Sequence, residues 1–161
     1  MRPVGAAGPG VAGRGAVELT VGRTLVPGRA VGPALVLAEP LSLWGGLDPA
    51  TGRVIDARHP QLGARVTGRV LVMPTGRGSS SSSSVLAEAI RAKTAPAAIV
   101  LGEPDAILVL GAVVARELYG RTCPIVAVDA SALAGLPDGR ELEVEAGPDR
   151  AILRPASAPP G

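Results

Sequence analysis

Aromatic side chains are scarce in this 161-residue sequence, which has no phenylalanine, one tryptophan (Trp44) and one tyrosine (Tyr119). The hydrophobic fraction is nevertheless 47% and comes mainly from alanine, valine, leucine and isoleucine. A chain of this length suits one domain, whose folding removes roughly 70% of the unfolded chain's surface from water. The sequence therefore predicts a single core built from aliphatic side chains.

Residues that bind metals or form disulfides are equally scarce. Cys123 is the only cysteine and His59 the only histidine. One cysteine forms no disulfide within the chain, and it is too few for an iron–sulfur cluster, which several thiolates usually hold. His59 stands before a proline and has no second histidine near it, so it is a poor candidate for a metal ligand. We predict no metal site here and expect any cluster to belong to a partner.

Strong charge and long apolar runs are also lacking. The net charge is +2, and the arginines and the single lysine, Lys93, are scattered, which argues against a nucleic-acid-binding surface. No run approaches the roughly 18 apolar residues of a membrane span. Residues 1–15 contain no apolar stretch of signal-peptide length. We expect a soluble, cytoplasmic protein that binds neither nucleic acid nor membrane.

Glycine, proline and alanine dominate both ends of the chain. Residues 1–15 and 155–161 have this composition, which predicts disordered tails. The folded domain is therefore expected over residues 16–154.

The first half of that domain is punctuated by turn signals. Short β-type runs occur at residues 17–21 and 34–37, and turn signals occur at Pro27-Gly28 and Asp48-Pro49. This pattern predicts short strands joined by ordered loops.

From residue 68 onward, apolar runs alternate with helical patterns. Val85, Leu86, Ala89 and Ile90 form one apolar stripe along a helix. Strands that alternate with helices predict an α/β fold with a parallel βαβαβ unit and right-handed crossovers, flanked by the short strands. Ligand sites in such sheets gather at the carboxyl ends of the strands. The expected strands and helices, in alternation, are residues 68–73, 85–93, 97–101, 105–119 and 124–128.

The most informative segment for chemistry is PTGRGSSSSSS, residues 74–84, which joins the first of these strands to the first helix. A serine run alone is typical of a flexible linker. Here Gly76 and Gly78 permit a tight turn, and the later serines are suited to cap the helix. The free N–H groups of the first helical turn suit an anion or an alkoxide, and Arg77 adds a positive charge. The residues alone do not distinguish a serine that binds substrate from one that is catalytic.

The other polar candidates have simpler interpretations. Asp48 and Asp56 lie in a loop punctuated by glycine and proline, where aspartate usually shapes turns. Cys123 begins an apolar strand and is expected to be a buried, inert thiol. Residues 141–146 and 150–154 predict a closing hairpin. In it Glu141, Glu143 and Glu145 alternate onto a solvated face without a chemical role.

An ordered series of motifs resembles one known family. The series starts with Pro27-Gly28-Arg29 and ends with GEPDAILVLGAVVARELYG at residues 102–120. Between these come EPLS, GG, DP, TGR, ID, RHP, the GRGSS segment and TAPAA. Over about residues 21–129 these motifs resemble the small subunit, or swivel domain, of aconitase X proteins, which include phosphomevalonate dehydratase and cis-3-hydroxy-L-proline dehydratase.

This resemblance implies a swivelling β/β/α domain that closes over a large subunit. The large subunit would hold an iron–sulfur cluster and most substrate contacts, and the pair would remove water from a hydroxy acid. The family's proposed proton acceptor is the first serine after the GRG turn, which is Ser79 here. Arg77, Gly78 and Ser80 are then candidates for binding the substrate. Some relatives lack serine in the later part of the run, so residues 81–84 are assigned turn and helix-start roles.

Several alternatives remain open at this point. The substrate is cis-3-hydroxy-L-proline or a related acid, favoured by a composition typical of GC-rich bacteria, or else phosphomevalonate. A different class would be a non-catalytic or phospho-carrier swivel module, with His59 as the phosphorylated residue, by analogy of fold alone. A third is a small-molecule binding protein without a partner.

Overall fold

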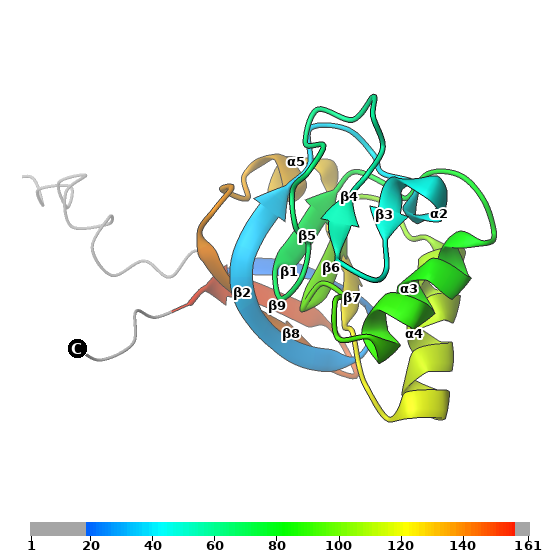
Figure 1. Cartoon of the computed structure of the whole chain (residues 1–161). Coiled ribbons are helices and arrows are strands. Elements are labelled where there is room, and N and C mark those ends of the chain that lie inside the picture. The colour runs from blue at the N-terminus through cyan, green and yellow to red at the C-terminus, as the bar shows by residue number, and fades with distance from the viewer. Residues whose placement is uncertain (1–18, 157–161) are drawn as a thin grey trace, which may run out of the picture.

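A closed barrel of strands forms the centre of the protein in the computed structural model, which describes residues 19–156 (Figure 1). Neighbouring strands follow the order β1-β7-β6-β5-β2-β8-β9, and β1 pairs with β9 to close the ring. The four strands β2, β5, β6 and β7 are parallel, and the other pairings are antiparallel. The strands are β1 (Thr20–Val26), β2 (Gly28–Val36), β5 (Val70–Met73), β6 (Ala98–Leu101), β7 (Ile125–Ala127), β8 (Glu141–Ala146) and β9 (Ala151–Pro155).

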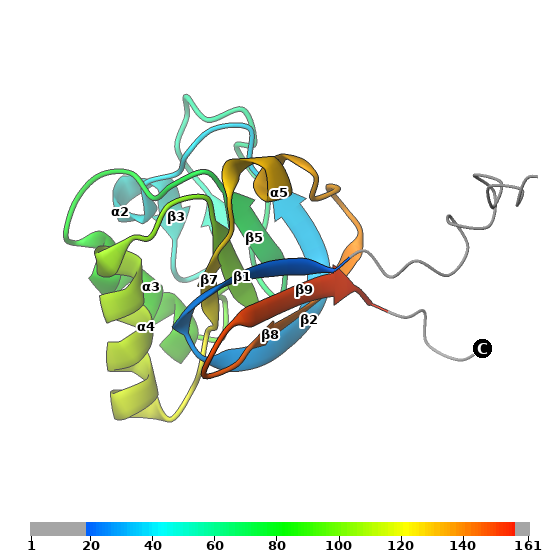
Figure 2. The ribbon, with the colours of Figure 1, turned by 180° about the vertical axis from the view of Figure 1, so that it is seen from behind.

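The predicted α/β fold with a parallel βαβαβ unit is confirmed. β5, β6 and β7 lie side by side in parallel, joined by α3 (Ser82–Arg91) and α4 (Ala106–Tyr119). Figures 1 and 2 show both helices on one side of the barrel, with β8 and β9 on the side that has no helix. No helix in residues 19–156 is both long and apolar enough to cross a membrane.

Local sequence explains where the two long helices begin and end. α4 has the expected ends, because the Asp105 side chain accepts the Ile107 and Leu108 N–H groups and Gly120 takes a left-handed φ of 65°. α3 begins and ends at other residues than the sequence predicted. It begins at Ser82 instead of Val85, since serines form its first turn, and it stops before Lys93, whose φ is 64°.

The first half of the domain contains longer strands than the sequence pattern predicted. β1 and β2 are nearly continuous strands separated by Pro27 alone, and Gly28, which was expected in a turn, is the first residue of β2. Gly22 and Gly32 lie inside these strands, where a Cβ atom would come within 2.6 Å of Ala127 O and 2.3 Å of Gly68 O. These glycines permit close approach of neighbouring backbones, so they are not turn signals.

The sequence did not predict four small elements. Between β2 and β5, the polar segment folds into α2 and the β3–β4 pair, and a short helix, α5, follows β7. The figures show all of them toward the end of the barrel where β2 and β5 finish. Their bounds are α2 (Leu43–Gly46), β3 (Leu47–Asp48), β4 (Arg53–Val54) and α5 (Ala130–Ala134).

The tail predicted for residues 1–15 lies outside the described residues, as do residues 157–161. The start of the expected C-terminal tail belongs to the fold. Pro155 pairs with Leu142 in the β8–β9 ladder, and the Ala156 N–H donates to Glu141 O at 3.0 Å. The strand therefore continues past residue 154, where we placed the domain's end.

Three of the parallel strands, β5, β6 and β7, bury both of their faces. One face points into the barrel, and the other packs under α3 and α4. Along β5, Val70 and Val72 point inward, while Leu71 and Met73 face the helices. Valine and alanine suit the narrow barrel interior, and larger leucine and isoleucine side chains fill the helix layer. The aliphatic core expected from the composition thus has two layers.

The β8–β9 hairpin has the alternation that the sequence predicted. Leu142 and Val144 are buried, whereas Glu143 and Glu145 point outward and pair with arginines. Arg29 donates to Glu143 and lowers the pKa of that carboxyl. The hairpin glutamates therefore stabilise neighbouring strands at the surface.

Substitution of Gly111 by alanine tests the packing of α4 on α3. A Cβ atom at Gly111 would lie 2.6 Å from Ser83 O and 3.2 Å from Leu86 Cβ. Alanine normally favours a helix by about 1 kcal/mol over glycine. We expect Gly111→Ala instead to lower the free energy of unfolding by about 1–2 kcal/mol, measured by urea denaturation. Glu117→Ala, at an exposed site of the same helix, should change it by less than about 0.5 kcal/mol. Stabilisation by Gly111→Ala would contradict the close packing.

Candidate functional site

The candidate site is the loop between β5 and α3, which begins at Pro74 at the carboxyl end of a parallel strand. Figure 1 shows this loop passing α2 before it enters α3. An isolated parallel bridge joins Gly76 to Leu41, just before α2. Thr75 adds a bond from its Oγ1 to Gly76 O at 3.0 Å. The loop is therefore tied to the segment that contains α2, unlike a flexible linker.

Ser79 has the most constrained side chain among the predicted site residues. It is partly buried, and its Oγ accepts the Ser81 N–H at 3.1 Å. Its carbonyl oxygen accepts the Ser82 N–H at 3.0 Å. An N–H that already points at Oγ is suited to stabilise negative charge there. The geometry thus permits Ser79 to act as a base in its alkoxide form.

The expected capping by the later serines takes a different form. Ser81 occupies the N-cap position of α3, but its side chain makes no capping hydrogen bond. Ser79 instead binds the Ser81 N–H, and Ser83 Oγ donates to Ser80 O at 2.8 Å. The serine side chains bond mainly within the turn itself, because the chain enters the helix from a tight turn at Ser81.

The two glycines of the turn are required by close contacts. A Cβ atom at Gly76 would lie 2.0 Å from Asp105 Oδ2. Gly78 has a φ of 99°, and a Cβ atom there would lie 2.5 Å from Ser42 Oγ. Neither position has room for a side chain, so the turn is held between Ser42 and the start of α4.

Arg77 and Ser80, the other predicted substrate contacts, are exposed on the turn with Gly78. Among residues 19–156, the Arg77 guanidinium has no hydrogen-bond or ion-pair partner. It is therefore available to an anion. The structure brings these residues next to Ser79 but contains no substrate that would test their roles.

The hollow at Ser79 is much too small for a substrate. It has a volume of about 10 Å³, which is about the room that one water molecule needs. Ser79, Ser82 and Asp105 are among its lining residues. The described part of this chain therefore does not by itself enclose a substrate at Ser79.

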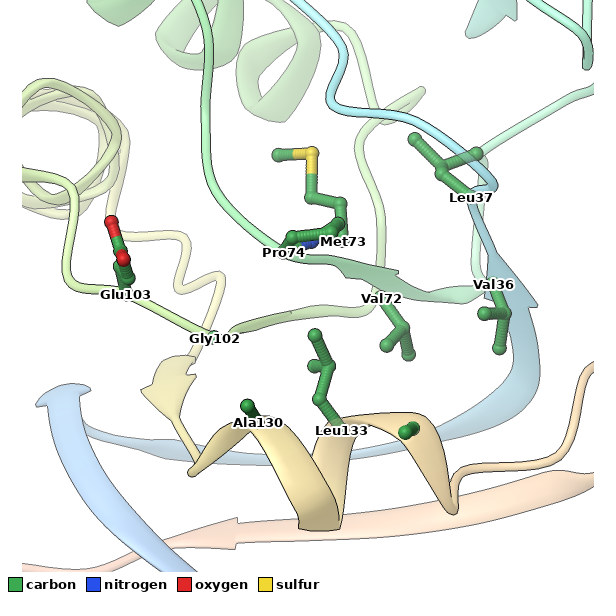
Figure 3. A pocket seen from close by; sticks show the side chains of 10 residues that line it. Val36, Leu37, Val72, Met73, Pro74, Gly102, Glu103, Ala130 and Leu133 are labelled. Carbon is green, nitrogen blue, oxygen red and sulfur yellow. The ribbon is translucent and has the colours of Figure 1, made fainter.

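A larger pocket of about 440 Å³ lies at the same end of the barrel but does not include Ser79. Figure 3 shows Val36, Val72 and Leu133 converging between the strand ends and α5, with Glu103 to one side. Most of its lining is hydrocarbon, and Glu103 is the only charged residue among the residues that line it. An acidic substrate does not suit this lining.

The aspartates and the histidine singled out in the sequence have structural roles. Asp48 accepts the Ala50 N–H and the Thr51 hydroxyl, and Asp56 accepts the Arg58 N–H, as expected of turn formers. His59 is buried, with Nε2 3.0 Å from Glu39 O and Nδ1 accepting the Gln61 N–H. Both ring nitrogens are therefore already engaged.

The residues of this chain do not fit an iron–sulfur cluster. In the part of the chain that the structure describes, no three histidine, cysteine, aspartate or glutamate side chains gather as metal ligands. Cys123 is only 1% exposed, and its thiol lies 3.5 Å from Pro96 O. The thiol is therefore buried as expected, and this burial raises its pKa to about 12.

Sequence reasoning missed the residues that hold the serine turn in place. Ser42 and Ser82 touch neighbouring segments, and Asp105 both caps α4 and lies against Gly76. An aspartate directly before a helix signals an N-cap, so Asp105 was recognisable in part. The contact partners of Ser42 and Ser82 are set by the fold and leave no local pattern.

The barrel and the serine turn define a class of protein, an α/β domain that presents a serine at the start of a helix. In residues 19–156 this domain has no enclosed substrate cavity at that serine and no site for a cluster. The chain belongs to the aconitase X swivel domain family, whose model matches residues 19–153.

Comparison with known proteins supports the same family. The chain is 49% identical over 149 residues to cis-3-hydroxy-L-proline dehydratase of Pseudomonas aeruginosa, covering 88% of this chain and 26% of that protein. It is 42% identical over 125 residues to the phosphomevalonate dehydratase small subunit of Methanothermobacter thermautotrophicus, covering 77% and 91%. The structure of aconitase X from Thermococcus kodakaraensis (holo-form) superposes with a TM-score of 0.74 at 34% identity, covering 84% and 98%. The chain thus spans about a quarter of the bacterial relative and most of the archaeal small subunit.

Substitution of Gly78 by alanine tests the contact that holds the turn. Gly78→Ala places a side chain at a left-handed φ and sets its Cβ atom against the Ser42 hydroxyl. Gly63→Ala is the control, because it also places a side chain at a left-handed φ, 89°, but no atom lies within 4 Å of its Cβ atom. We expect both to destabilise the fold by about 1–2 kcal/mol through backbone strain. Gly78→Ala should cost about 1–2 kcal/mol more because of the contact. Equal thermal denaturation curves for the two variants would show that the turn does not press on Ser42.

The state of Cys123 is testable with a thiol reagent. Because burial keeps the thiol protonated and inaccessible, the native chain should not react with a disulfide reagent at pH 8, while the denatured chain reacts fully. The raised pKa contributes stability that is complete at neutral pH and falls as the pH rises above about 9, the ordinary value for an unfolded thiol. Rapid labelling of the native protein would contradict this burial.

Proposed function

We propose that this chain is the small subunit of a heteromeric aconitase X-type dehydratase, a hydro-lyase that removes water from a hydroxy acid. Ser79 is its proton acceptor. The observation that carries the proposal is the Ser79 side chain, whose Oγ already accepts the N–H of Ser81, the N-cap residue of α3, on a turn with no room for a substrate of its own. A site that is open in this way requires the surface of a partner to enclose the substrate.

The partner is a large subunit that holds an iron–sulfur cluster. The length relation supports this, because the chain matches only a quarter of a relative named as a whole dehydratase but 91% of one named as a small subunit. When bound there, the cluster would supply Lewis-acid assistance to the departing hydroxyl. A free thiol and a cluster-bearing partner both suit a reducing compartment, so we place the protein in the cytoplasm.

Ser79 acts on the carbon next to the substrate's activating group. Its alkoxide takes the proton from that carbon and becomes a hydroxyl, and the electrons of the C–H bond form the double bond as the hydroxyl group leaves. The Ser81 N–H stabilises the charge on Oγ before transfer. Arg77 binds an anionic group of the substrate, and Ser80 and the Gly78 backbone line the same turn.

The substrate is cis-3-hydroxy-L-proline or a closely related hydroxy acid. The match to the Pseudomonas cis-3-hydroxy-L-proline dehydratase, over 149 residues, is longer than the matches to the archaeal phosphomevalonate dehydratase small subunits of Methanothermobacter, over 125 residues, and of Methanopyrus, over 79 residues. Phosphomevalonate is the second candidate, because the chain has nearly the extent of a separate small subunit. Arg77, which has no partner among residues 19–156, would suit its phosphate.

The phospho-carrier alternative finds no support at His59. A phosphorylated histidine needs an accessible ring nitrogen, whereas this residue is 6% exposed and both nitrogens have partners. We therefore do not favour a carrier.

The decisive test is dehydration by the reconstituted pair. The chain is combined with its proposed large subunit, and the assay uses both hydroxy acids. Ser79→Ala should lower kcat by about 10³-fold or more with little change in KM, because it removes the base but not the contacts that bind substrate. It should also abolish exchange of the substrate proton with deuterated solvent.

Ser84→Ala is the matched control, since this serine is exposed and lies in the same run. It should keep kcat within about twofold. Full activity of Ser79→Ala, or activity of the large subunit alone, would refute the assignment of the base to this chain.

A further inference from the structure

A second serine of the run is tied to a distant segment of the chain. Ser82 is buried, and its Oγ accepts the Trp44 backbone N–H at 3.2 Å. The two residues are 38 positions apart. A hydroxyl in the first turn of a helix usually binds its own backbone, so this bond across to α2 calls for an explanation.

This bond is one of three hydrogen bonds that together connect Trp44 to Ser79. The Trp44 N–H donates to Ser82 Oγ, the Ser82 N–H donates to Ser79 O, and the Ser81 N–H donates to Ser79 Oγ. Ser82 therefore joins the turn that presents the candidate base to the segment at α2. Both the main chain and the hydroxyl of Ser79 depend on this turn.

A second contact holds the other side of the turn against the same segment. Ser42 Oγ donates to Trp44 O at 3.1 Å, and Gly78 lies directly against that hydroxyl. The turn is thus fixed on both sides of Ser79, by Gly78 before it and Ser82 after it. Trp44 is bonded through both its N–H and its carbonyl, while its side chain is 59% exposed.

We infer that Ser82 is a positioning residue for the dehydration: its bond to the Trp44 N–H sets the direction of Ser79 Oγ. This inference rests on the proposed role of Ser79 and adds a residue that acts only through it. A proton transfer is sensitive to small displacements of the base, whereas substrate contacts elsewhere are not. Loss of the bond should therefore change kcat and leave KM almost unchanged.

The bond itself is observable without any activity. Trp44 is the only tryptophan, so the full chain labelled with ¹⁵N-tryptophan shows one backbone amide and one indole signal. In Ser82→Ala the Trp44 amide should exchange with solvent about fivefold faster or more than in the wild type. In Ser84→Ala, the matched control, its exchange rate should be unchanged.

The effect on the reaction is measured in the reconstituted pair. Ser82→Ala should lower kcat by about 10- to 100-fold with KM within about twofold. Ser82→Thr, which keeps the hydroxyl, should restore most of the loss. Ser84→Ala should remain near the wild-type kcat.

A substitution at Trp44 removes the donor instead of the acceptor. Proline has no N–H, and the φ of Trp44, −69°, is one that proline adopts. Trp44→Pro should lower kcat as Ser82→Ala does. Trp44→Ala is its control, because it loses only the side chain and retains the N–H. In the Trp44→Pro background, Ser82→Ala should have little further effect, because both remove the same bond.

The outcomes separate this inference from the proposed function. Wild-type kcat in Ser82→Ala, together with loss of activity in Ser79→Ala, would overturn the positioning role and leave the base in place. If the losses of kcat in Ser82→Ala and Trp44→Pro were equal and added up in the double variant, that result would also overturn the positioning role. Full activity in Ser79→Ala would refute the proposed function instead.

Discussion

The pairing of β1 with β9 closes the barrel, and the arrangement of the site follows from that closure. A closed ring has no free sheet edge, so each strand must meet two neighbours and bury a face in the narrow interior. Gly22 and Gly32 permit this, because their missing side chains let backbone carbonyls of neighbouring segments approach. The parallel strands β2, β5, β6 and β7 then end at one rim, where the serine turn and the small elements gather.

The serine turn gains its rigidity from segments that lie far from it in the chain. Leu41 bridges to Gly76, Ser42 lies against Gly78, and Asp105 lies against Gly76 from the start of α4. A run of serines in isolation would be among the most flexible of sequences. Contact on two sides converts it into a turn whose hydroxyl has a defined hydrogen bond. Preorganisation of this kind is what a catalytic serine requires, since reorientation during the reaction would add to the barrier.

The same rim also shows why this domain is suited to act with a partner. The hollow at Ser79 is about the size of one water molecule, and the larger pocket beside it is apolar and excludes Ser79. Arg77 and Ser80 point outward on an exposed turn. A proposed base that is fixed but uncovered is consistent with an active site shared between two surfaces, as the proposed dehydratase requires.

Much of the fold was predictable from local patterns. The alternation of apolar runs with helical stripes predicted β5, α3, β6, α4 and β7, and Gly120 marked the end of α4, because these signals depend on neighbouring residues alone. The ordered motifs also predicted the family and singled out Ser79, whose chemical role is still a proposal. Barrel closure, the true length of β1 and β2, and the contacts of Ser42, Ser82 and Asp105 were decided by tertiary structure. A glycine needed for close approach and a glycine needed for a turn are the same letter, and a hydrogen bond between residues 38 positions apart leaves no periodic trace in the sequence.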